Sequence, residues 1–255
     1  MKYIKKFDNE AQLETYKKNN FIAPHVYLDS NLNTVKFMQE YEQLEYISST
    51  QTGGQYIDLG CKLMENTDDI QIDIKFNIKG YGKDGSGKQS TLIAAQPEVS
   101  PYPGFTLRKQ TTGSDTRIEI CAKWRFTNSI RQVSGTRYDS ILLSYPQTDN
   151  SSTYVSRNWK TIYEISETLD NIPDSQINDF TCHLFCALDS NNNPFRYAEA
   201  DLYYLKFTKG GQVIRNLIPV KKVATNEIGL YDIENDHLYI SQGDDPFVAG
   251  PIINN

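Results

Sequence analysis

The stretch that decides the fold runs over residues 200–251 and reads ADLYYLKFTKGGQVIRNLIPVKKVATNEIGLYDIENDHLYISQGDDPFVAGP. Apolar and polar residues roughly alternate over residues 201–208, which is the period of a strand with one buried face. The tetrad Lys209-Gly210-Gly211-Gln212 predicts a tight turn, so residues 213–220 should return as the antiparallel partner strand. A second pair, 229–232 with 237–240, is predicted across residues 234–236. These features are typical of the closing strands of a β-sandwich.

The rest of the chain has the composition of the same fold class. Its 255 residues, with 17 Tyr and 11 Phe, suit one large antiparallel sandwich with a small appendage. The cleanest alternation is over residues 70–79, where Ile and Phe occupy one face and polar residues the other. Other strands are predicted at residues 55–59, 90–95, 104–109, 116–123, 140–144, 160–165 and 181–188.

The order of these motifs resembles the laminin-G/concanavalin A-like jelly rolls. The closing motifs are YYLKF, GGQVIRNLIPV, GLYD, HLYI and PFVAGP, all between residues 203 and 251. LEYISST (44–50) and GQYIDLG (54–60) resemble the opening strands of that family, and LFCA (184–187) resembles a strand near its end. The resemblance covers about residues 41–251. It implies a mainly β protein, an antiparallel β-sandwich of the concanavalin-like jelly-roll type.

The first forty residues have a different character. Residues 1–7 predict a short strand, Asp8 is a good N-cap for a helix over residues 9–20, and residues 21–28 with 34–38 predict a hairpin around 29–33. Such a β-α-β-β arm (1–40) is too small for a stable core of its own. We expect it to dock on the sandwich (41–255), on another copy of the chain or on a larger body, or simply to cap the edge of the sandwich.

This arm also resembles a known group of leaders. The sequence MKYIKKFDNEAQLETYKKNNFIAPHVYLDSNLNTVKFM is similar to the leader of virion proteins from tailed phages of gut bacteria, including head fibres and other capsid-attached proteins. In those proteins the leader precedes a variable outer domain. The resemblance implies a bacteriophage structural protein attached to the capsid or the tail.

Two glycine- or asparagine-rich segments come close to ligand-binding motifs. Residues 82–88 have the glycines and lysine of a phosphate-binding loop, but Gln89 stands where Ser or Thr should hold magnesium, and a strand follows instead of a helix. Residues 189–193 supply the first, third and fifth oxygen donors of an EF-hand loop, but Pro194 replaces the glycine and Ala200 the twelfth-position glutamate. Both segments are predicted to be hairpin loops.

The acidic residues of the predicted strands do not form a catalytic pattern. Glycosidases on the concanavalin fold carry an E-x-D-x-x-E triplet, and this chain has none. Asp73 and Glu119 are isolated strand charges that we expect to be solvated. The histidines, His25, His183 and His237, fall in separate predicted elements with no serine or cysteine elbow nearby, which disfavours a catalytic triad.

The cysteines are predicted to be buried thiols. In one continuous strand Cys182 and Cys186 would have Cα atoms roughly 13 Å apart, whereas a disulfide needs less than about 7 Å. Cys61 and Cys121 also lie among strand residues, so a reducing compartment during folding follows. A zinc site from Cys182, His183, Cys186 and His237 is disfavoured because neighbours in a strand point to opposite faces. We expect no cofactor, although the family resemblance leaves open a structural calcium ion at a loop rim.

One set of residues suggests a binding surface. It consists of aromatic and cationic residues in two regions that read as loop-rich, between the central strands: Trp124, Arg125, Tyr145, Tyr154, Arg157 and Trp159. Aromatic rings bind sugars by stacking on their C–H faces, and polar side chains orient the hydroxyl groups. The alternative is that the tryptophans only pack in the core or at its margin.

Together these observations predict a non-enzymatic phage virion protein, capsid- or tail-attached, whose lectin-like sandwich contacts host-surface glycans or neighbouring subunits. Its expected partners are other virion proteins or copies of itself in a homo-oligomer. A bacterial carbohydrate-binding module and a glycoside hydrolase or lyase on the same fold remain alternatives. The net charge of -6 is spread along the chain, which disfavours nucleic acid and anionic membranes. With no apolar run of signal-peptide or membrane-spanning length, we expect assembly in the host cytoplasm and no membrane insertion.

Overall fold

The computed structural model describes the backbone of residues 25–28, 34–38, 40–62, 70–83, 89–95, 105–112, 115–122, 125–131, 139–145, 153–157, 160–165 and 181–253. Side chains are described for residues 40–62, 71–83, 89–95, 105–111, 118–119 and 181–253. Within these ranges the chain is built from β-strands, and no helix occurs. None of the described residues forms a helix long and apolar enough to cross a membrane.

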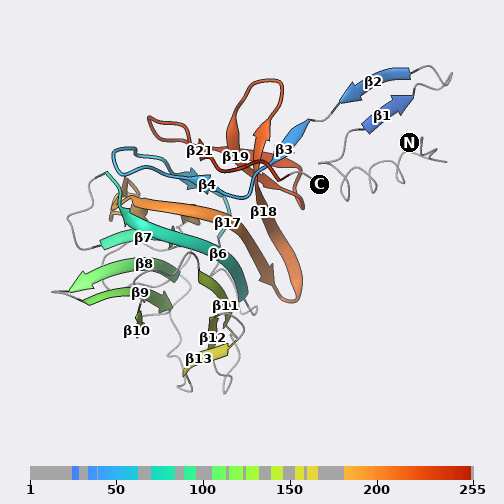
Figure 1. Cartoon of the computed structure of the whole chain (residues 1–255). Helices are drawn as coiled ribbons and strands as arrows, with labels where there is room; N and C mark the ends of the chain where they lie inside the picture. The colour runs from blue at the N-terminus through green and yellow to red at the C-terminus, as the bar shows by residue number, and fades with distance from the viewer. Residues whose placement is uncertain are drawn as a thin grey trace.

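The larger sheet has the strand order β13-β12-β11-β6-β17-β18-β19-β20 (Figure 1). Its strands are β6 (Ile70–Tyr81), β11 (Asp139–Tyr145), β12 (Thr153–Arg157), β13 (Lys160–Ile165), β17 (Ala198–Lys209), β18 (Gln212–Lys222), β19 (Ile228–Asp232) and β20 (His237–Ile240). Three short strands extend it: β3 (Tyr41–Gln43) pairs with β18, and β4 (Ile47–Ser48) pairs with β17 and with β21 (Val248–Ala249). All these pairings are antiparallel.

The smaller sheet has the order β10-β9-β8-β7-β14-β5. Its strands are β5 (Ile57–Asp58), β7 (Gln89–Ala94), β8 (Phe105–Thr112), β9 (Asp115–Ala122), β10 (Arg125–Arg131) and β14 (His183–Leu184). Two further pairs stand apart from both sheets: β15 (Ala187–Leu188) with β16 (Pro194–Phe195), and β1 (His25–Leu28) with β2 (Thr34–Met38). The second pair confirms the hairpin predicted for the arm, while the predicted strand 1–7 and helix 9–20 lie outside the described residues.

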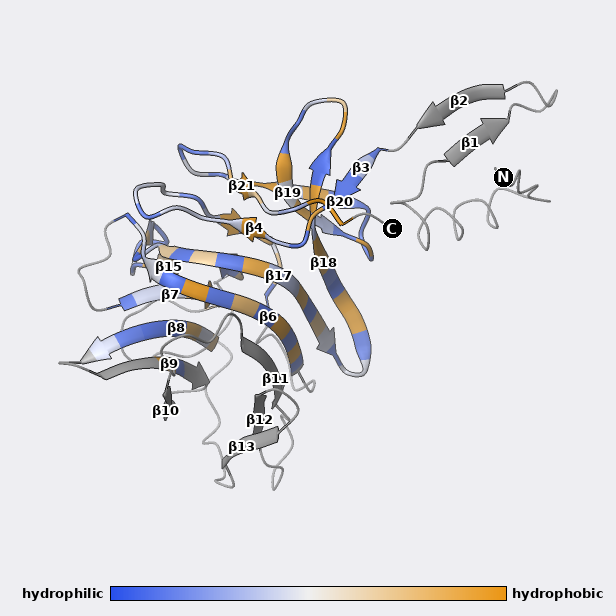
Figure 2. Ribbon diagram, in the orientation of Figure 1, coloured by the Kyte–Doolittle hydropathy of each residue, from blue (hydrophilic) through white to orange (hydrophobic). Residues whose placement is uncertain are grey.

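The core lies between the two sheets. Ile72, Ile74, Phe76 and Ile78 of β6 are at most 2% exposed and belong to one cluster with residues of β7, β8, β17, β18 and β19. The intervening residues of β6 are polar, and Figure 2 shows the resulting alternation of colours along β6, β17 and β18. The predicted one-sided burial of this strand is confirmed, and the chain is an antiparallel β-sandwich.

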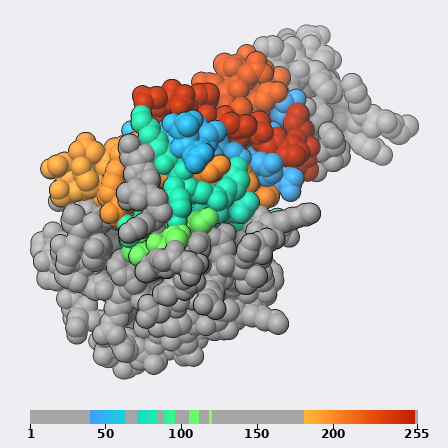
Figure 3. Space-filling view, turned by 60° about the vertical axis from the view of Figure 1, so that its left-hand side comes forward, coloured from blue at the N-terminus to red at the C-terminus, as the bar shows by residue number. Residues whose placement is uncertain are grey.

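The C-terminal third forms the predicted pair of hairpins. Gly210 and Gly211, at φ +54° and +78°, make the two-residue turn between β17 and β18, a backbone conformation that favours glycine. Strand β19 then pairs with both β18 and β20. Figure 3 shows segments from the blue and red ends of the colour scale meeting on one face, because β3 and β4 insert beside strands from the end of the chain.

The predicted strand 181–188 is wrong as a continuous element. It divides into β14 and β15 at Phe185, which has φ +66°, an unusual value for a bulky residue. The break is held by packing and hydrogen bonding: the Phe185 ring lies 4.9 Å from that of Phe247, and its amide donates to the Leu92 carbonyl. Burial of this aromatic ring outweighs the local backbone preference. The strand spacing assumed for Cys182 and Cys186 therefore does not apply.

Candidate functional site

The residues predicted to bind a ligand belong to strands more than to loops. Arg125 is the first residue of β10, Tyr145 the last of β11, and Tyr154 and Arg157 lie in β12, which corrects the reading of these regions as loop-rich. The polar residues in RFTNSIR and TYVSR blur the alternation of these strands, so their pairing with neighbours decides their structure. Trp124 and Trp159 lie outside the described residues.

The strand register places part of the predicted set on two neighbouring strands. Tyr154 pairs with Ser144, and Arg157 pairs with Ile141. Tyr145 and Tyr154 are therefore one register step apart, and successive register positions belong to opposite faces of a sheet. Arg125 belongs instead to the smaller sheet, where β10 is the edge strand. The described members are therefore divided between the two sheets: Arg125 lies on the β10 edge strand, and Tyr145, Tyr154 and Arg157 lie on β11 and β12. We call these six residues the binding rim.

The calcium-like segment is a hairpin loop, as predicted. It connects β15 and β16, and the Asp189 carboxylate accepts hydrogen bonds from the Asn191 and Asn193 amides, each at 2.8 Å, and from the Asn193 side chain at 3.1 Å. These hydrogen bonds lower the pKa of Asp189. The acidic group is thus used to close the turn. The phosphate-loop-like segment also leads from strand to strand, since β6 ends at Tyr81 and β7 begins at Gln89.

The two strand carboxylates differ from each other. Asp73 accepts a hydrogen bond from the Tyr204 hydroxyl at 2.9 Å. Glu119 is not a solvated charge, because Nε and Nη2 of Arg108, its cross-strand neighbour, each donate to its Oε2 at 3.0 Å, and both side chains are largely buried. The expectation for Glu119 is therefore wrong. A buried, paired carboxylate of this kind is explained by the ion pair it makes.

The histidines and cysteines occupy separate environments. His183 pairs with Asp58 across β14 and β5, with Nε2 3.8 Å from the carboxylate, and its Nδ1 lies 3.0 Å from the Thr181 carbonyl. His237 is exposed on β20. Cys182 and Cys186 are buried and unbridged, and burial raises the pKa of both thiols. Within the described part of the chain no group of three His, Cys, Asp or Glu side chains is placed to hold a metal ion.

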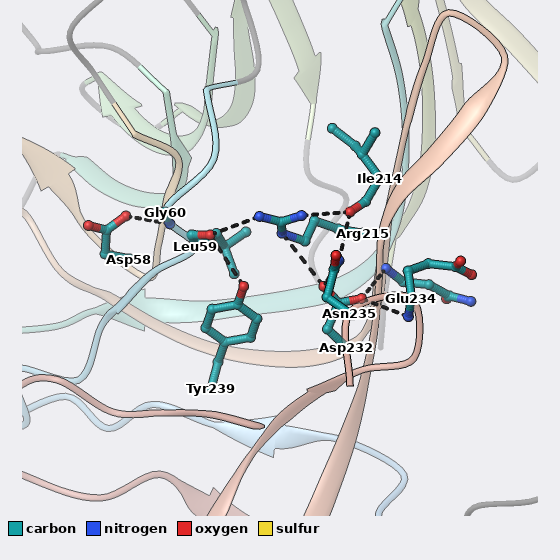
Figure 4. Close-up of polar contacts among 10 residues, drawn as sticks. Asp58, Leu59, Gly60, Ile214, Arg215, Asp232, Glu234, Asn235 and Tyr239 are labelled. Carbon is teal, nitrogen blue, oxygen red and sulfur yellow. Dashed lines mark hydrogen bonds and ion pairs between the residues drawn. The ribbon is translucent and has the colours of Figure 1, made fainter. Parts of the chain in front are cut away.

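The sequence reasoning missed a buried polar network around Asp232 (Figure 4). The Asp232 side chain has no exposed surface. Its Oδ1 accepts from the Asn216 amide at 3.0 Å and the Glu234 amide at 3.1 Å, while Oδ2 accepts from the Asn235 side chain at 2.6 Å. Arg215 Nε lies 3.6 Å from Oδ2, which is an ion pair but too long for a hydrogen bond.

The same network joins the two sheets at one end of the sandwich. The Arg215 guanidinium and the Tyr239 hydroxyl both donate to the Leu59 carbonyl, each at 3.3 Å. Leu59 directly follows β5 of the smaller sheet, whereas Arg215 and Tyr239 belong to β18 and β20 of the larger one. Cys61 lies close by, and burial raises its pKa to about 11. Because Arg215 and Tyr239 of the larger sheet donate to a main-chain carbonyl beside the smaller one, the network is a structural tie between the sheets.

Comparisons with known proteins show no family for this chain. No family model and no curated protein matches the sequence. Among solved structures, similarity is found to the CBM40 domain of the Ruminococcus gnavus IT-sialidase bound to α2,3-sialyllactose (12% identity, TM-score 0.44, 66% of this chain and 90% of that one). The NanB sialidase from Streptococcus pneumoniae gives 12% identity and a TM-score of 0.44 over 68% of this chain and 27% of that one. Sheep galectin-11 gives 10% identity and a TM-score of 0.28 over 63% and 100%.

Proposed function

We propose that the protein is a non-enzymatic display domain that binds glycans through the binding rim. The observation that carries the proposal is the register of β11 and β12, in which the backbones of Tyr145, Tyr154 and Arg157 occupy two neighbouring strands. Trp159 follows Arg157 by two residues, and Trp124 immediately precedes the first residue of β10. Aromatic and cationic residues on neighbouring strands of a sandwich suit sugar recognition by ring stacking and hydrogen bonding.

The proposed setting is a phage virion. Its support is the resemblance of residues 1–40 to the leaders of virion proteins, together with the separate β1–β2 hairpin that this region contains. In this proposal the arm attaches the protein to the capsid or tail, and the sandwich faces outward. Deletion of residues 1–40 is expected to leave a folded sandwich that no longer associates with particles. Co-purification of the truncated protein with particles would contradict the attachment role of the arm.

A glycan array tests the binding function. The full-length protein is applied to printed neutral and sialylated oligosaccharides, beside a variant carrying Trp124→Ala and Trp159→Ala and a control carrying His237→Ala, which removes an exposed aromatic ring from β20. We expect the double variant to bind more weakly than the full-length protein and the control to bind as well as it does. Unchanged binding in the double variant would remove the rim as the site. If the full-length protein binds none of the printed glycans, the proposed function itself is wrong.

A further inference from the structure

The outer face of the larger sheet carries adjoining tyrosines where β17 lies between β4 and β6. A β-bulge in the ladder between β17 and β6 is responsible: Leu202 pairs with Phe76, Tyr204 pairs with Lys75, and Tyr203 is the extra residue between them. Leu202 and Leu205 are both buried, while Tyr203 and Tyr204 are both partly exposed. The bulge thus places two consecutive tyrosines on the face opposite to the core.

One of them, Tyr203, belongs to a row of residues that crosses four strands. The rings of Tyr46, just before β4, and Tyr203, on β17, have centroids 5.2 Å apart. On one side Lys75 of β6 lies over the Tyr203 ring, 4.7 Å from its centroid. On the other side, Gly250 follows β21 and lies against the Tyr46 ring. A Cβ atom added to Gly250 would come within 2.9 Å of atoms of that ring. At about 4.8 Å between neighbouring strands, a row from β21 to β6 spans about 14 Å.

A second, polar row runs beside the first. Asp201 of β17 accepts hydrogen bonds from the Ser48 hydroxyl, from Lys79 at 2.7 Å and from the Asn77 side chain at 3.4 Å. The Asp201 side chain is only 9% exposed, which is low for a charge on the outer face of a sheet. These three hydrogen bonds fix the orientation of the Asp201 carboxylate. Of the donors, Asn77 is partly exposed and Lys79 is exposed. Polar groups of fixed geometry beside aromatic rings are the usual arrangement of a site that orients hydroxyl groups.

From this geometry we infer that Tyr46, Ser48, Lys75, Asn77, Lys79, Asp201 and Tyr203, the tyrosine surface, form a second contact surface whose ligand is a neutral, extended oligosaccharide. The inference rests on the proposed glycan-binding function and adds a place and a ligand class to it. The surface crosses four strands, about 14 Å, which favours an extended chain over a single sugar.

The charges on this surface favour a neutral ligand. Lys79 is paired with Asp201, and Lys75 lies over an aromatic ring. Next to them Lys206 pairs with Asp73 in the strand register. Among the described residues of this surface, lysines and aspartates are therefore interleaved and produce no concentrated field of either sign to attract an acidic sugar. Binding should accordingly be insensitive to ionic strength, since salt screens attraction between exposed charges but not ring stacking.

The test screens the full-length protein for binding to two kinds of probe, linear neutral oligosaccharides and sialylated oligosaccharides. Each probe that binds is then titrated by calorimetry at low and at high salt. Two variants of the tyrosine surface are compared: Tyr203→Ser, which removes a ring, and Asn77→Ala, which removes a polar group at little risk to the fold. The controls are His237→Ala and the Trp124→Ala, Trp159→Ala double variant. Thermal unfolding establishes that each variant is folded.

We expect Tyr203→Ser to weaken binding of a neutral oligosaccharide about tenfold, as for the loss of one aromatic contact. Asn77→Ala should weaken it by a smaller factor, and binding should be independent of salt. If Tyr203→Ser does not fold, the effect of Asn77→Ala on binding alone decides whether the tyrosine surface binds the oligosaccharide. Unchanged binding in both folded surface variants, with loss in the tryptophan double variant, overturns this inference and leaves the proposed function standing. Binding confined to sialylated probes also overturns it, and no binding to any probe overturns both.

Discussion

Replacing Asp232 by alanine should destabilise the sandwich strongly. The change removes the acceptor of three hydrogen bonds and the only anion within 4 Å of Arg215 among the ion pairs of the described residues. The amides of Asn216 and Glu234 would lose their partner inside the protein, and the guanidinium, whose side chain is 17% exposed, would lose its counter-charge. Breaking a buried charge pair from one side typically costs about 3–5 kcal/mol, so we expect a loss of about 4 kcal/mol.

Equilibrium urea unfolding, followed by far-ultraviolet circular dichroism, measures this loss as a shift of the midpoint. A domain of this kind has a free energy of unfolding of about 5–15 kcal/mol, so the variant should still fold. Asp232→Asn should cost less, because the amide oxygen can still accept from both main-chain amides. The matched control is Glu234→Ala, an exposed side chain in the same turn, which should change stability by less than about 0.5 kcal/mol. A loss below about 1 kcal/mol for Asp232→Ala would refute the assignment of the network as a tie between the sheets.

Three further predictions concern packing and pH. Phe247→Ala should destabilise the protein by about 3–5 kcal/mol in the same urea assay, because the ring is 1% exposed and packs on Phe185. Gly229→Ala should lower the thermal midpoint, because the new Cβ would collide with the Tyr239 carbonyl of the paired strand; an unchanged midpoint would contradict this close approach. Burial, with the nearby charge of Glu40, raises the pKa of Tyr41 from 10.0 to about 12, so the neutral phenol favours the fold. Its contribution is complete below pH 10 and lost as the pH rises through about 12, and Tyr41→Phe should make unfolding in this range less dependent on pH.

The parts of the fold that could be predicted depend on local physics. The Gly210-Gly211 turn needs positive φ at two successive residues, and its sequence shows this directly. Strand β6 is recognisable because every second residue must enter one core. The DSNNN loop could be recognised as a turn because an aspartate followed by asparagines closes such loops through its own side chain. In each case the decisive contact lies within a few residues of the signal.

The rest depends on contacts between distant residues. Nothing near Phe185 indicates a positive φ, which is maintained by a ring from Phe247. The sequence predicts a solvated Glu119 because its partner Arg108 lies eleven residues away on another strand. The Asp232 network was hidden for the same reason, since Leu59 and Arg215 are 156 residues apart. The buried GLYD motif does contain a signal for the network, since an aspartate ends an otherwise apolar strand. The partners of that aspartate follow only from the pairing of β18 with β19.

The bulge at Tyr203 shows how one such contact decides both faces of the sheet. In a regular strand, residues 202 and 205 would point to opposite sides, because their separation is odd. Leu202 and Leu205 are nevertheless both fully buried, and the extra residue between Leu202 and Tyr204 makes this possible. This is why the alternation over residues 201–208 is only approximate in the sequence. The irregularity that keeps both leucines in the core is the same one that places Tyr203 beside Tyr46, so the tyrosine surface exists because of how the core is packed.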